Sequence, residues 1–332
     1  MPKLCEVIPS RLEEHRASKA WQQCRSDAGT PLGIDILKLK KKSAVYRLSG
    51  AGPDGEVVIA KRCRAPTARI ERIIHEELLG RLPVPALRFY GFLEEPDGQF
   101  CWLFLEEAAG ESYSPANNAH RALAGEWLAH VHEASIHAGL QSRLPSREPA
   151  HYLHLLRKIH STALEHLSNP VLPRSDVQVL ERILLSCALL QSHWRELENV
   201  CAAAPRTIVH GDFVVKNVRV RDGAAGAAFL AFDWEASGWG VPATDFAQFS
   251  GRSVSPDLRV YSAVRNWTES GVEGMMLRGL APCGKLFRLI DDMFWATSVF
   301  SFNSYDFLMK PISYLKSYEN RLTDAFKAAG WT

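Results

Sequence analysis

Residues 206–235, RTIVHGDFVVKNVRVRDGAAGAAFLAFDWE, carry the most informative pattern of polar and apolar residues in the chain. It contains His210, then Asp212, and then Asn217 after four further residues. Asp233 follows sixteen residues beyond Asn217. Aspartate, asparagine and glycine are common in loops for local reasons alone. These polar residues are set apart by the strand-like runs that separate them, so residue types and spacing have to be interpreted together.

A β-hairpin is predicted between the last two of these polar residues. Residues 218–220 alternate as a strand does, residues 222–226 have turn chemistry, and residues 229–232 form a second apolar run. Two short strands joined by such a turn run antiparallel. Asn217 therefore begins the first strand and Asp233 follows the second, which brings both side chains to the same end of the hairpin.

The chemistry of these side chains indicates a magnesium site. An amide oxygen and a carboxylate are hard oxygen ligands, and Mg²⁺ takes few protein ligands together with waters and nucleotide phosphates. Asp212, five residues before Asn217, is expected beside the metal without binding it. In that position it would accept the proton of an attacking hydroxyl group.

The motifs resemble those of the aminoglycoside phosphotransferase and choline kinase-like family. The resemblance rests on the H-x-D-x-x-x-x-N pattern of residues 210–217, on Phe232-Asp233-Trp234-Glu235, and on residues 240–246, GVPATDF. It implies an α+β, protein-kinase-like fold with two lobes. A small antiparallel sheet with one helix would form the N-terminal lobe, and a larger, mostly helical lobe would follow.

The resemblance also implies roles for individual residues. Asp212 would be the catalytic base, Asn217 and Asp233 the metal ligands, and Asp245 a structural acid that braces the loop. The cofactors would be ATP or GTP with Mg²⁺. The activity would be transfer of the γ-phosphate to a hydroxyl group of a small molecule, by a small-molecule kinase.

The first strands are expected at residues 34–48, around a turn, and at residues 56–62. In the family the turn between the first two strands covers the nucleotide phosphates, but here it is Lys40-Lys41-Lys42-Ser43-Ala44 and has no glycine. Its lysines either meet phosphate or form a solvated basic turn, so they are left out of the site. Lys61 follows an apolar run where the family keeps the lysine that holds the α- and β-phosphates. Arg62 points to the opposite face of a regular strand.

A helix over residues 68–82 should supply the acidic partner of Lys61. At 100° per residue its apolar residues form one arc, in which Glu71 falls inside and Glu77 at the edge. A carboxylate on an apolar face needs a partner, and Lys61 is the candidate. Glu71 is therefore the predicted partner, with Glu77 as the alternative.

Two more strands, at residues 87–93 and 101–105, complete the small sheet. The segment after them resembles the hinge of the family, where adenine would hydrogen-bond to backbone groups near Glu106 and Ala108. The resulting domain prediction is a nucleotide-binding lobe at residues 1–107 and a catalytic and substrate-binding lobe at residues 108–332.

The remaining helices follow from apolar periodicity and caps. They are expected at residues 10–24 with Ser10 as the cap, 119–133, 152–167 and 176–197, and over much of 260–331. In the family the last helices shape the acceptor pocket. Aromatic residues such as Trp295, Tyr314 and Tyr318 either line that pocket or pack in the core. The pair Asp291-Asp292 either attracts a cationic acceptor or faces solvent.

The amino-acid composition narrows the possible binding partners and the cellular location of the protein. The net charge is +2, from 39 basic and 37 acidic residues, which indicates neither a nucleic-acid nor a membrane partner. It also gives no general acidic excess for a polycationic aminoglycoside, so choline, homoserine or a sugar stays open as acceptor. The seven cysteines are scattered without a C-x-x-C pair, and no apolar leader is present, so reduced thiols in a cytoplasmic protein are expected.

Two other functions remain open. A nucleotide-binding scaffold, or pseudokinase, fits the glycine-free turn, whereas the Asp212, Asn217 and Asp233 set argues against it. A protein kinase is disfavoured because no A-P-E signature follows Asp233.

Overall fold

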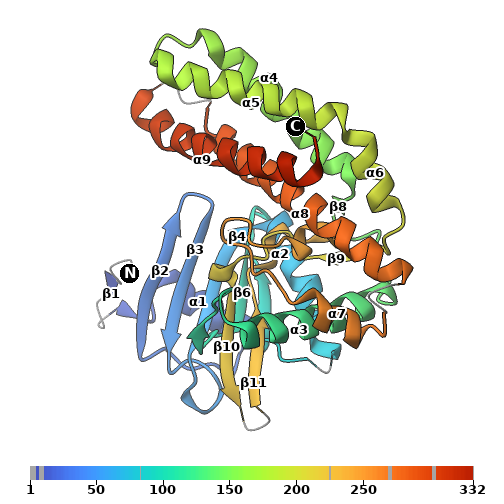
Figure 1. Cartoon of the computed structure of the whole chain (residues 1–332). Helices are drawn as coiled ribbons and strands as arrows, with labels where there is room; N and C mark the ends of the chain where they lie inside the picture. The colour runs from blue at the N-terminus through green and yellow to red at the C-terminus, as the bar shows by residue number, and fades with distance from the viewer. Residues whose placement is uncertain are drawn as a thin grey trace. The chain divides into compact units, whose positions relative to one another are not determined.

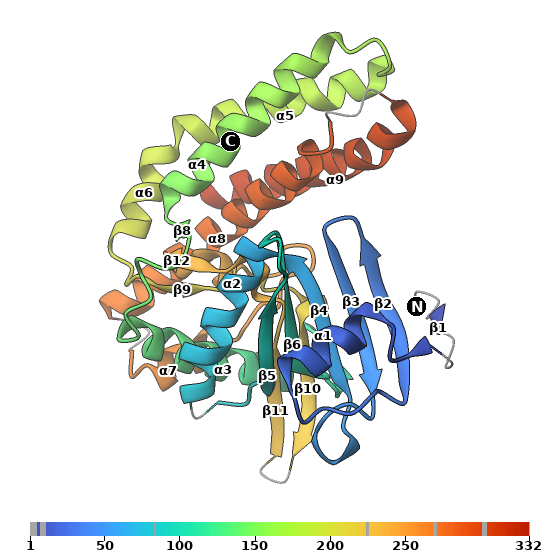
Figure 2. The ribbon, with the colours of Figure 1, turned by 180° about the vertical axis from the view of Figure 1, so that it is seen from behind.

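The computed structural model describes residues 5–6, 11–82, 84–223, 226–267, 271–300 and 304–331. The chain forms two compact units (Figures 1 and 2). The first comprises Met1–Tyr113 with Lys216–Ser237, and the second comprises Ser114–Val215 with Gly238–Thr332. The first unit thus extends past residue 107 and also takes in the hairpin predicted after Asn217.

An antiparallel sheet forms the centre of the first unit. Its strand order is β1-β2-β3-β4-β6-β5. The strands are β1 (Cys5–Glu6), β2 (Gly33–Lys40), β3 (Ser43–Ser49), β4 (Val58–Arg64), β5 (Phe89–Glu94) and β6 (Phe100–Glu106). Every neighbouring pair is antiparallel, as the sequence predicted.

Alternating burial along β3 shows why this sheet forms. Every second residue of the strand is buried, because successive side chains point to opposite faces. Tyr46 and Leu48 pack on the covered face with Trp102, Phe104 and Trp21. Trp21 comes from helix α1 (Arg16–Cys24) and donates its indole N–H to the Ala51 carbonyl at 3.0 Å. The first core of the protein is therefore an aromatic layer between α1 and the sheet.

Helix α1 is shorter than predicted. The prediction began the helix at residue 10, but residues 11–15 form turns and the helix begins at Arg16. His15 has an extended backbone, and its Nδ1 accepts a hydrogen bond from the Ala17 N–H at 3.2 Å. The side chain of a histidine therefore satisfies one of the free N–H groups in the first turn of the helix. The predicted cap, Ser10, lies outside the described residues.

The second helix of this unit also differs from its prediction. Helix α2 spans Ala65–Ile73, with a proline in its first turn, where the fixed φ of proline suits a helix start. It continues as a π-helical turn at Ile74–Leu78 and a 3-10 turn at Leu79–Arg81. A π turn holds more residues than an α turn, which shifts the apolar pattern beyond Ile73. The regular helix therefore ends well before the predicted residue 82.

The hairpin after Asn217 forms with the predicted pairing. Strands β10 (Val218–Gly223) and β11 (Gly226–Ala231) are antiparallel, with Val218 opposite Ala231. The short β7 (Glu111–Ser112) pairs with β10 on its other edge. The 3-10 turns Val215–Asn217 and Trp234–Ala236 flank the hairpin.

The second unit is mostly helical. Its helices are α3 (Asn118–Ile136), α4 (Pro149–Glu165), α5 (Arg174–Ser192), α6 (Trp194–Ala202), α7 (Leu258–Val264), α8 (Val272–Thr297) and α9 (Tyr305–Ala329). A small sheet of β8 (Ser146–Arg147), β12 (Gly238–Gly240) and β9 (Thr207–Val209) adjoins the 3-10 turn Pro242–Phe246.

One predicted helix of this unit is divided in two. Residues 176–197 were expected as a single helix, but α5 ends and α6 begins at His193, whose ψ is 9°. The imidazole of His193 bonds to Glu196 at 2.8 Å and stacks on Trp331 with ring centroids 4.4 Å apart. These side-chain contacts hold the break, and apolar periodicity alone does not reveal them.

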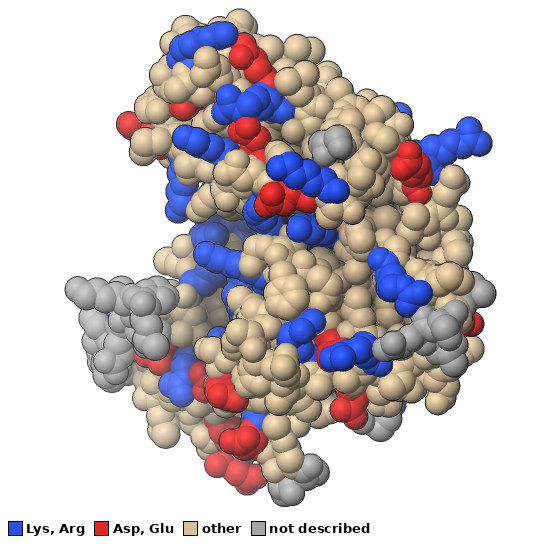
Figure 3. Space-filling view, viewed as in Figure 1, with Lys and Arg blue, Asp and Glu red and all other residues tan. Residues whose placement is uncertain are grey.

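Charges are mixed over the helical unit. Across α4, α5 and α9, in the upper part of Figure 3, basic and acidic side chains lie interspersed. Within the described parts of the chain, no helix combines the length and hydropathy that a membrane span requires. Six described cysteines are free thiols: Cys24, Cys63, Cys101, Cys187, Cys201 and Cys283.

Candidate active site

A cavity of about 310 Å³ lies in the first unit, against β2, β3, β4 and β6. Its walls are largely apolar and its polar groups converge from a few positions. The lining residues are Leu37, Lys38, Val45, Ile59, Lys61, Glu71, Leu87, Leu105, Glu106, Glu107, Ala108, Arg219, Phe232 and Asp233. An apolar cavity with few convergent polar groups is typical of a small-molecule or cofactor site.

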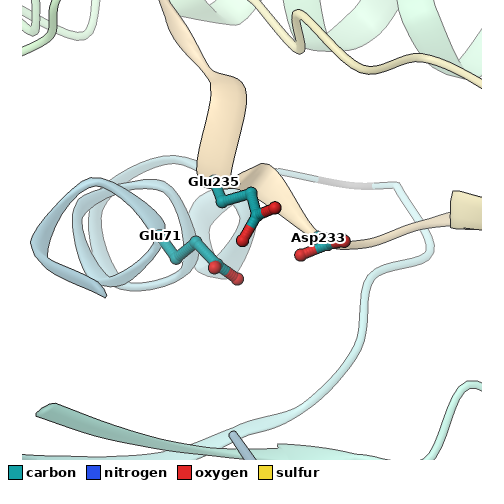
Figure 4. A group of neighbouring side chains, drawn as sticks. All are labelled: Glu71, Asp233 and Glu235. Atoms are coloured by element: carbon teal, nitrogen blue, oxygen red, sulfur yellow. The ribbon is translucent and has the colours of Figure 1, made fainter. Parts of the chain in front are cut away.

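Lys61 is the polar centre of this cavity. Its side chain is 8% exposed, and Nζ donates to Glu71 Oε1 at 2.5 Å. Nζ also pairs with Asp233 and lies 3.7 Å from Glu235 Oε2. Figure 4 shows the three carboxylates gathered together, Glu71 from α2 and the other two from the segment after β11. Arg62, the next residue in the strand, turns to the other face and bonds to Glu95 at 2.6 Å.

The acidic and basic groups around Lys61 shift one another's pKa values. Burial alone would lower the pKa of Lys61, but Glu71 and Asp233 raise it, so the ammonium stays charged. Burial raises the pKa of Glu71 to about 7, against the pull of Lys61. Burial alone would also raise the pKa of Asp233, yet Lys61 outweighs it and the pKa is lowered. Lys61 and Asp233 are thus an ion pair at neutral pH.

The charges of this centre fit a divalent cation. Ligand oxygens of Glu71, Asp233 and Glu235 all lie within 4.8 Å of one another. Lys61 lies within ion-pair distance of all three carboxylates, and Lys38, which also lines the cavity, helps to lower the pKa of Asp233. Glu71 Oε2 is buried and has no hydrogen-bond partner among the described residues. Glu235 belongs to the motif of residues 232–235 but was not predicted as a site residue, although it stands two positions after Asp233.

Asn217 and Asp233 stand at the same end of the β10–β11 hairpin. The backbone carbonyl of Asn217 accepts from the Phe232 N–H at 3.0 Å, which fixes the two strand ends against each other. Asn217 is buried, with 3% of its surface exposed, and is not among the residues that line the cavity. Asp233 has a φ of +66°, a conformation rarely adopted by residues other than glycine and often found at functional sites.

Glu106 and Ala108, the predicted adenine contacts, both line the cavity. The carboxylate of Glu106 pairs with Arg221 and accepts from the Arg88 N–H at 2.9 Å. The side chain of Glu106 is therefore engaged within the protein. The lysines of the turn at residues 40–42 are exposed and do not line the cavity.

Asp212 belongs to the second unit, in a loop held by Asp245. Asp245 is buried, and its carboxylate accepts from the His210 N–H at 2.8 Å and from the Gly211 N–H at 3.3 Å. Gly211 has a φ of +76°, which favours glycine at this position. His132 lies 3.6 Å from Asp245, and burial lowers its pKa, so the imidazole is neutral. The loop before Asp212 is thus fixed by backbone hydrogen bonds to one buried carboxylate.

Arg288 of α8 is a second site residue that was not predicted from the sequence. Its Nη2 lies 3.0 Å from Asp212 Oδ1, and its Nη1 donates to the Gly211 carbonyl at 2.8 Å. The same guanidinium bonds to Asp292 Oδ1 at 2.8 Å. Burial alone would lower the pKa of Arg288, but Asp292 and Asp212 raise it. A fixed positive charge therefore stands beside Asp212.

The pair Asp291-Asp292, left open between a cation site and solvent, is paired with arginines. Asp292 Oδ2 lies 3.6 Å from Arg321 Nη2, in addition to its bond with Arg288. Asp291 Oδ1 lies 3.8 Å from Arg147 Nη1, and burial raises the pKa of Asp291 to about 6. Neither carboxylate simply faces solvent.

The fold and these residues define a two-lobed, protein-kinase-like phosphotransferase. The sequence matches the phosphotransferase enzyme family over residues 43–270, more than half of the chain. The chain belongs to this family, as the motifs predicted. A search of curated proteins finds no significant match.

Solved structures share the fold at low sequence identity. The GDP and kanamycin complex of APH(2")-IIIa has a TM-score of 0.62 and 12% identity, covering 91% of this chain and 97% of that one. The streptomycin–ATP complex of APH(2")-IIa has a TM-score of 0.56 and 13% identity, covering 94% and 97%. Plasmodium vivax ethanolamine kinase has a TM-score of 0.57 and 14% identity, covering 86% and 82%. Family and fold together identify a small-molecule phosphotransferase.

Proposed function

We propose that the protein transfers the γ-phosphate of ATP or GTP to a hydroxyl group of a small molecule. The observation that carries the proposal is the cavity of the first unit, where Lys61 stands among three carboxylates at the end of an apolar pocket. An apolar wall suits a nucleobase, and an ammonium with neighbouring acids suits phosphates and their metal ion.

The nucleotide would bind along the lining residues of this cavity. The backbone near Glu106 and Ala108 would hydrogen-bond to the base, and Lys61, oriented by Glu71, would hold the α- and β-phosphates. The complexes of the structural neighbours with GDP and ATP support this choice of ligand.

Asn217 and Asp233 would hold Mg²⁺, since both supply oxygen ligands at one end of the hairpin. When bound, the ion would neutralise phosphate charge and draw the phosphates into position. Glu235 adds a further carboxylate beside Asp233. Lys61 keeps the carboxylate of Asp233 ionised and directed at the cavity.

Asp212 would act as the base of the reaction. Its carboxylate accepts the proton of the acceptor hydroxyl while the hydroxyl oxygen bonds to the γ-phosphorus. The bond from that phosphorus to the β-phosphate oxygen breaks, and the nucleoside diphosphate leaves. Arg288 fixes one oxygen of Asp212, and Asp245 fixes the loop behind it. Positioning and charge stabilisation supply most of the acceleration in such reactions.

The acceptor is a metabolite or an aminoglycoside-type antibiotic in this proposal. Kanamycin and streptomycin in two neighbours and ethanolamine kinase as a third support both options. The scattered free cysteines support a reducing compartment, so we place the reaction in the cytoplasm.

The test is nucleotide-dependent phosphorylation of a library of alcohols, sugars, hydroxy acids and aminoglycosides, with Mg²⁺ and with EDTA. Transfer to at least one hydroxyl compound that stops in EDTA is the expected result. Nucleotide binding without transfer to any compound would overturn the proposal. It would favour a nucleotide-binding scaffold, the function that fits the exposed, glycine-free turn at residues 40–42.

A further inference from the structure

Helices α8 and α9 share a continuous face, and Arg288 at one end of this face contacts Asp212. The helices lie side by side in both views (Figures 1 and 2). The α8–α9 face consists of Arg288, Asp292 and Trp295 of α8 and Tyr314, Tyr318 and Arg321 of α9. Each set follows the spacing of four and then three residues that places side chains on one side of a helix. Two contacts join the sets, Arg321 with Asp292 at 3.6 Å and Trp295 with Tyr314 at 6.0 Å between ring centroids.

The face has a defined length and an apolar end. From Arg288 to Trp295 a helix rises about 10 Å, which is the length of a molecule of about two rings. Trp295 is 59% exposed, so its ring is open to a ligand. Arg288 at the other end bonds to Asp212. A ring bound on Trp295 could therefore place a distal hydroxyl group at the base.

Each carboxylate of this region has an arginine within ion-pair distance. Asp212 pairs with Arg288, and Asp292 pairs with both Arg288 and Arg321. Asp291, beside the face, has Arg147 at 3.8 Å, while its Oδ2 is buried without a hydrogen-bond partner among the described residues. Charge-assisted pairs with arginine are among the stronger polar contacts in proteins. An ammonium group of a ligand would have to displace a guanidinium that is covalently held in place.

The tyrosine rings are likewise engaged by cations of the chain itself. The guanidinium of Arg321 lies 5.3 Å from the ring centroid of Tyr318. Lys310 Nζ lies 5.9 Å from the ring centroid of Tyr314. Aromatic faces attract cations through their quadrupole, and a cation of the protein at the same face competes with a cationic ligand. The face thus offers a cationic ligand neither a free carboxylate nor a free tyrosine ring among these residues.

We infer that the acceptor is a hydroxyl compound without cationic groups, either uncharged or anionic, bound along the α8–α9 face with a ring on Trp295. This inference rests on the proposed function and narrows its substrate class. It sets this chain apart from kinases of aminoglycosides and amino alcohols, whose acceptors carry amines.

Acceptors matched in size and differing in charge test the inference. Kanamycin, choline and ethanolamine represent cationic alcohols, and uncharged disaccharides and sugar acids represent the inferred class. We expect kcat/KM for the best uncharged or anionic acceptor to exceed that for every cationic acceptor by about 100-fold or more. Equal or better turnover of a cationic acceptor would overturn the inference while the proposed function stands.

A binding experiment tests the inference even if no acceptor is phosphorylated. In Arg321→Met, Asp292 loses one of its two arginines and the ring of Tyr318 loses its cation. Calorimetry with kanamycin should show no binding to the wild-type protein at low millimolar concentration, whereas the variant should bind kanamycin measurably, with an affinity about tenfold above that detection limit. Lys316→Met removes the same charge from an exposed position of α9 and serves as the control.

The result that contradicts the inference is kanamycin binding to wild type, or equal binding by wild type, Arg321→Met and Lys316→Met. Should Arg321→Met fail to fold, Lys310→Met takes its place. Lys310 is exposed, so its removal frees the ring of Tyr314 without opening the core. An unchanged kanamycin affinity in Lys310→Met then counts against the inference, and an affinity above that of Lys316→Met supports it.

Discussion

Each unit contains a largely buried cation in contact with several carboxylates, and the two centres differ in how these charges are paired. Lys61 lies within ion-pair distance of Glu71, Asp233 and Glu235, whereas Arg288 pairs with Asp212 and Asp292, and Arg321 adds a second contact to Asp292. The first centre gathers three carboxylates at one point, which suits a metal ion with phosphates. The second is close to neutral and needs no further cation.

The difference explains how similar residue types can serve opposite purposes. Around Lys61 the three carboxylates converge on one point, where a divalent ion could bind. Around Arg288 one guanidinium contacts Asp212, Asp292 and the Gly211 carbonyl together, which fixes the two carboxylates relative to each other. A fixed carboxylate suits a base that has to meet one hydroxyl group.

The largest effect is expected from the base itself. Asp212→Ala should lower kcat by on the order of 10² to 10⁴-fold, because the hydroxyl proton loses its acceptor. Nucleotide affinity should be preserved, since the cavity around Lys61 contains no part of Asp212. Steady-state kinetics with a nucleotide titration measure both quantities. Full activity of the variant would show that another group is the base.

The metal preference of the two centres provides the next test. Mg²⁺ with nucleotide at 100 times the dissociation constant should stabilise the wild-type protein by about 2.7 kcal/mol, measured by thermal unfolding. Asp233→Asn should lose most of this stabilisation, because it removes one of the three carboxylates gathered around Lys61. Asp292→Asn, which removes a carboxylate of the balanced centre, should keep it.

Equal losses in Asp233→Asn and Asp292→Asn would remove the contrast between the centres. Stabilisation that persists in EDTA would instead separate nucleotide binding from the metal.

A smaller effect is expected from Arg288. Arg288→Met should lower kcat by about tenfold or more while the nucleotide KM stays near that of wild type, because Asp212 loses its fixed orientation. Arg288→Lys retains the charge without the planar group that contacts both Asp212 and the Gly211 carbonyl, and it should recover part of the loss. If the two variants lose the same activity, charge at this position contributes nothing and the positioning role fails.

The smallest expected effect is on the pH dependence of the free energy of unfolding. His75 of the first unit is buried, stacks on Phe89 with centroids 5.5 Å apart, and burial lowers its pKa to about 3. The unfolded chain then binds the proton at higher pH than the folded one, so stability falls as pH falls below about 6.5. The slope from one such group is at most about 1.4 kcal/mol per pH unit.

His75→Phe should flatten this part of the profile, measured by urea unfolding between pH 6.5 and pH 4. His154→Gln, at an exposed position, is the control for the loss of a histidine. A profile of His75→Phe as steep as that of wild type would mean that other groups dominate the acid sensitivity.

Much of the first centre was predictable from the sequence. Strand alternation placed Lys61 and Arg62 on opposite faces of the sheet. Helical periodicity placed Glu71 on the helix face toward Lys61, and Lys61 Nζ lies 2.5 Å from Glu71 Oε1. Turn residues and two apolar runs predicted the hairpin that brings Asn217 and Asp233 to one end. These predictions depend on short-range geometry, which the backbone imposes within one or two elements.

The irregular helix ends were not predictable in the same way. His15 caps α1, a π turn ends α2, and His193 divides α5 from α6. Each depends on a side chain or turn that competes with an otherwise continuous apolar pattern, and periodicity averages over such single contacts.

The sequence by itself determined the family, the sheet with its hairpin, and the residue types that suit phosphoryl transfer, because these follow from spacing along the chain. Only the tertiary structure decided that Arg288 meets Asp212, 76 positions earlier, and that Asp291 and Asp292 are paired with arginines. Pairs between distant elements depend on how helices pack, and no local periodicity encodes which charge will face which. The charge balance of the second centre, and with it the inferred class of acceptor, is therefore a property of the folded protein.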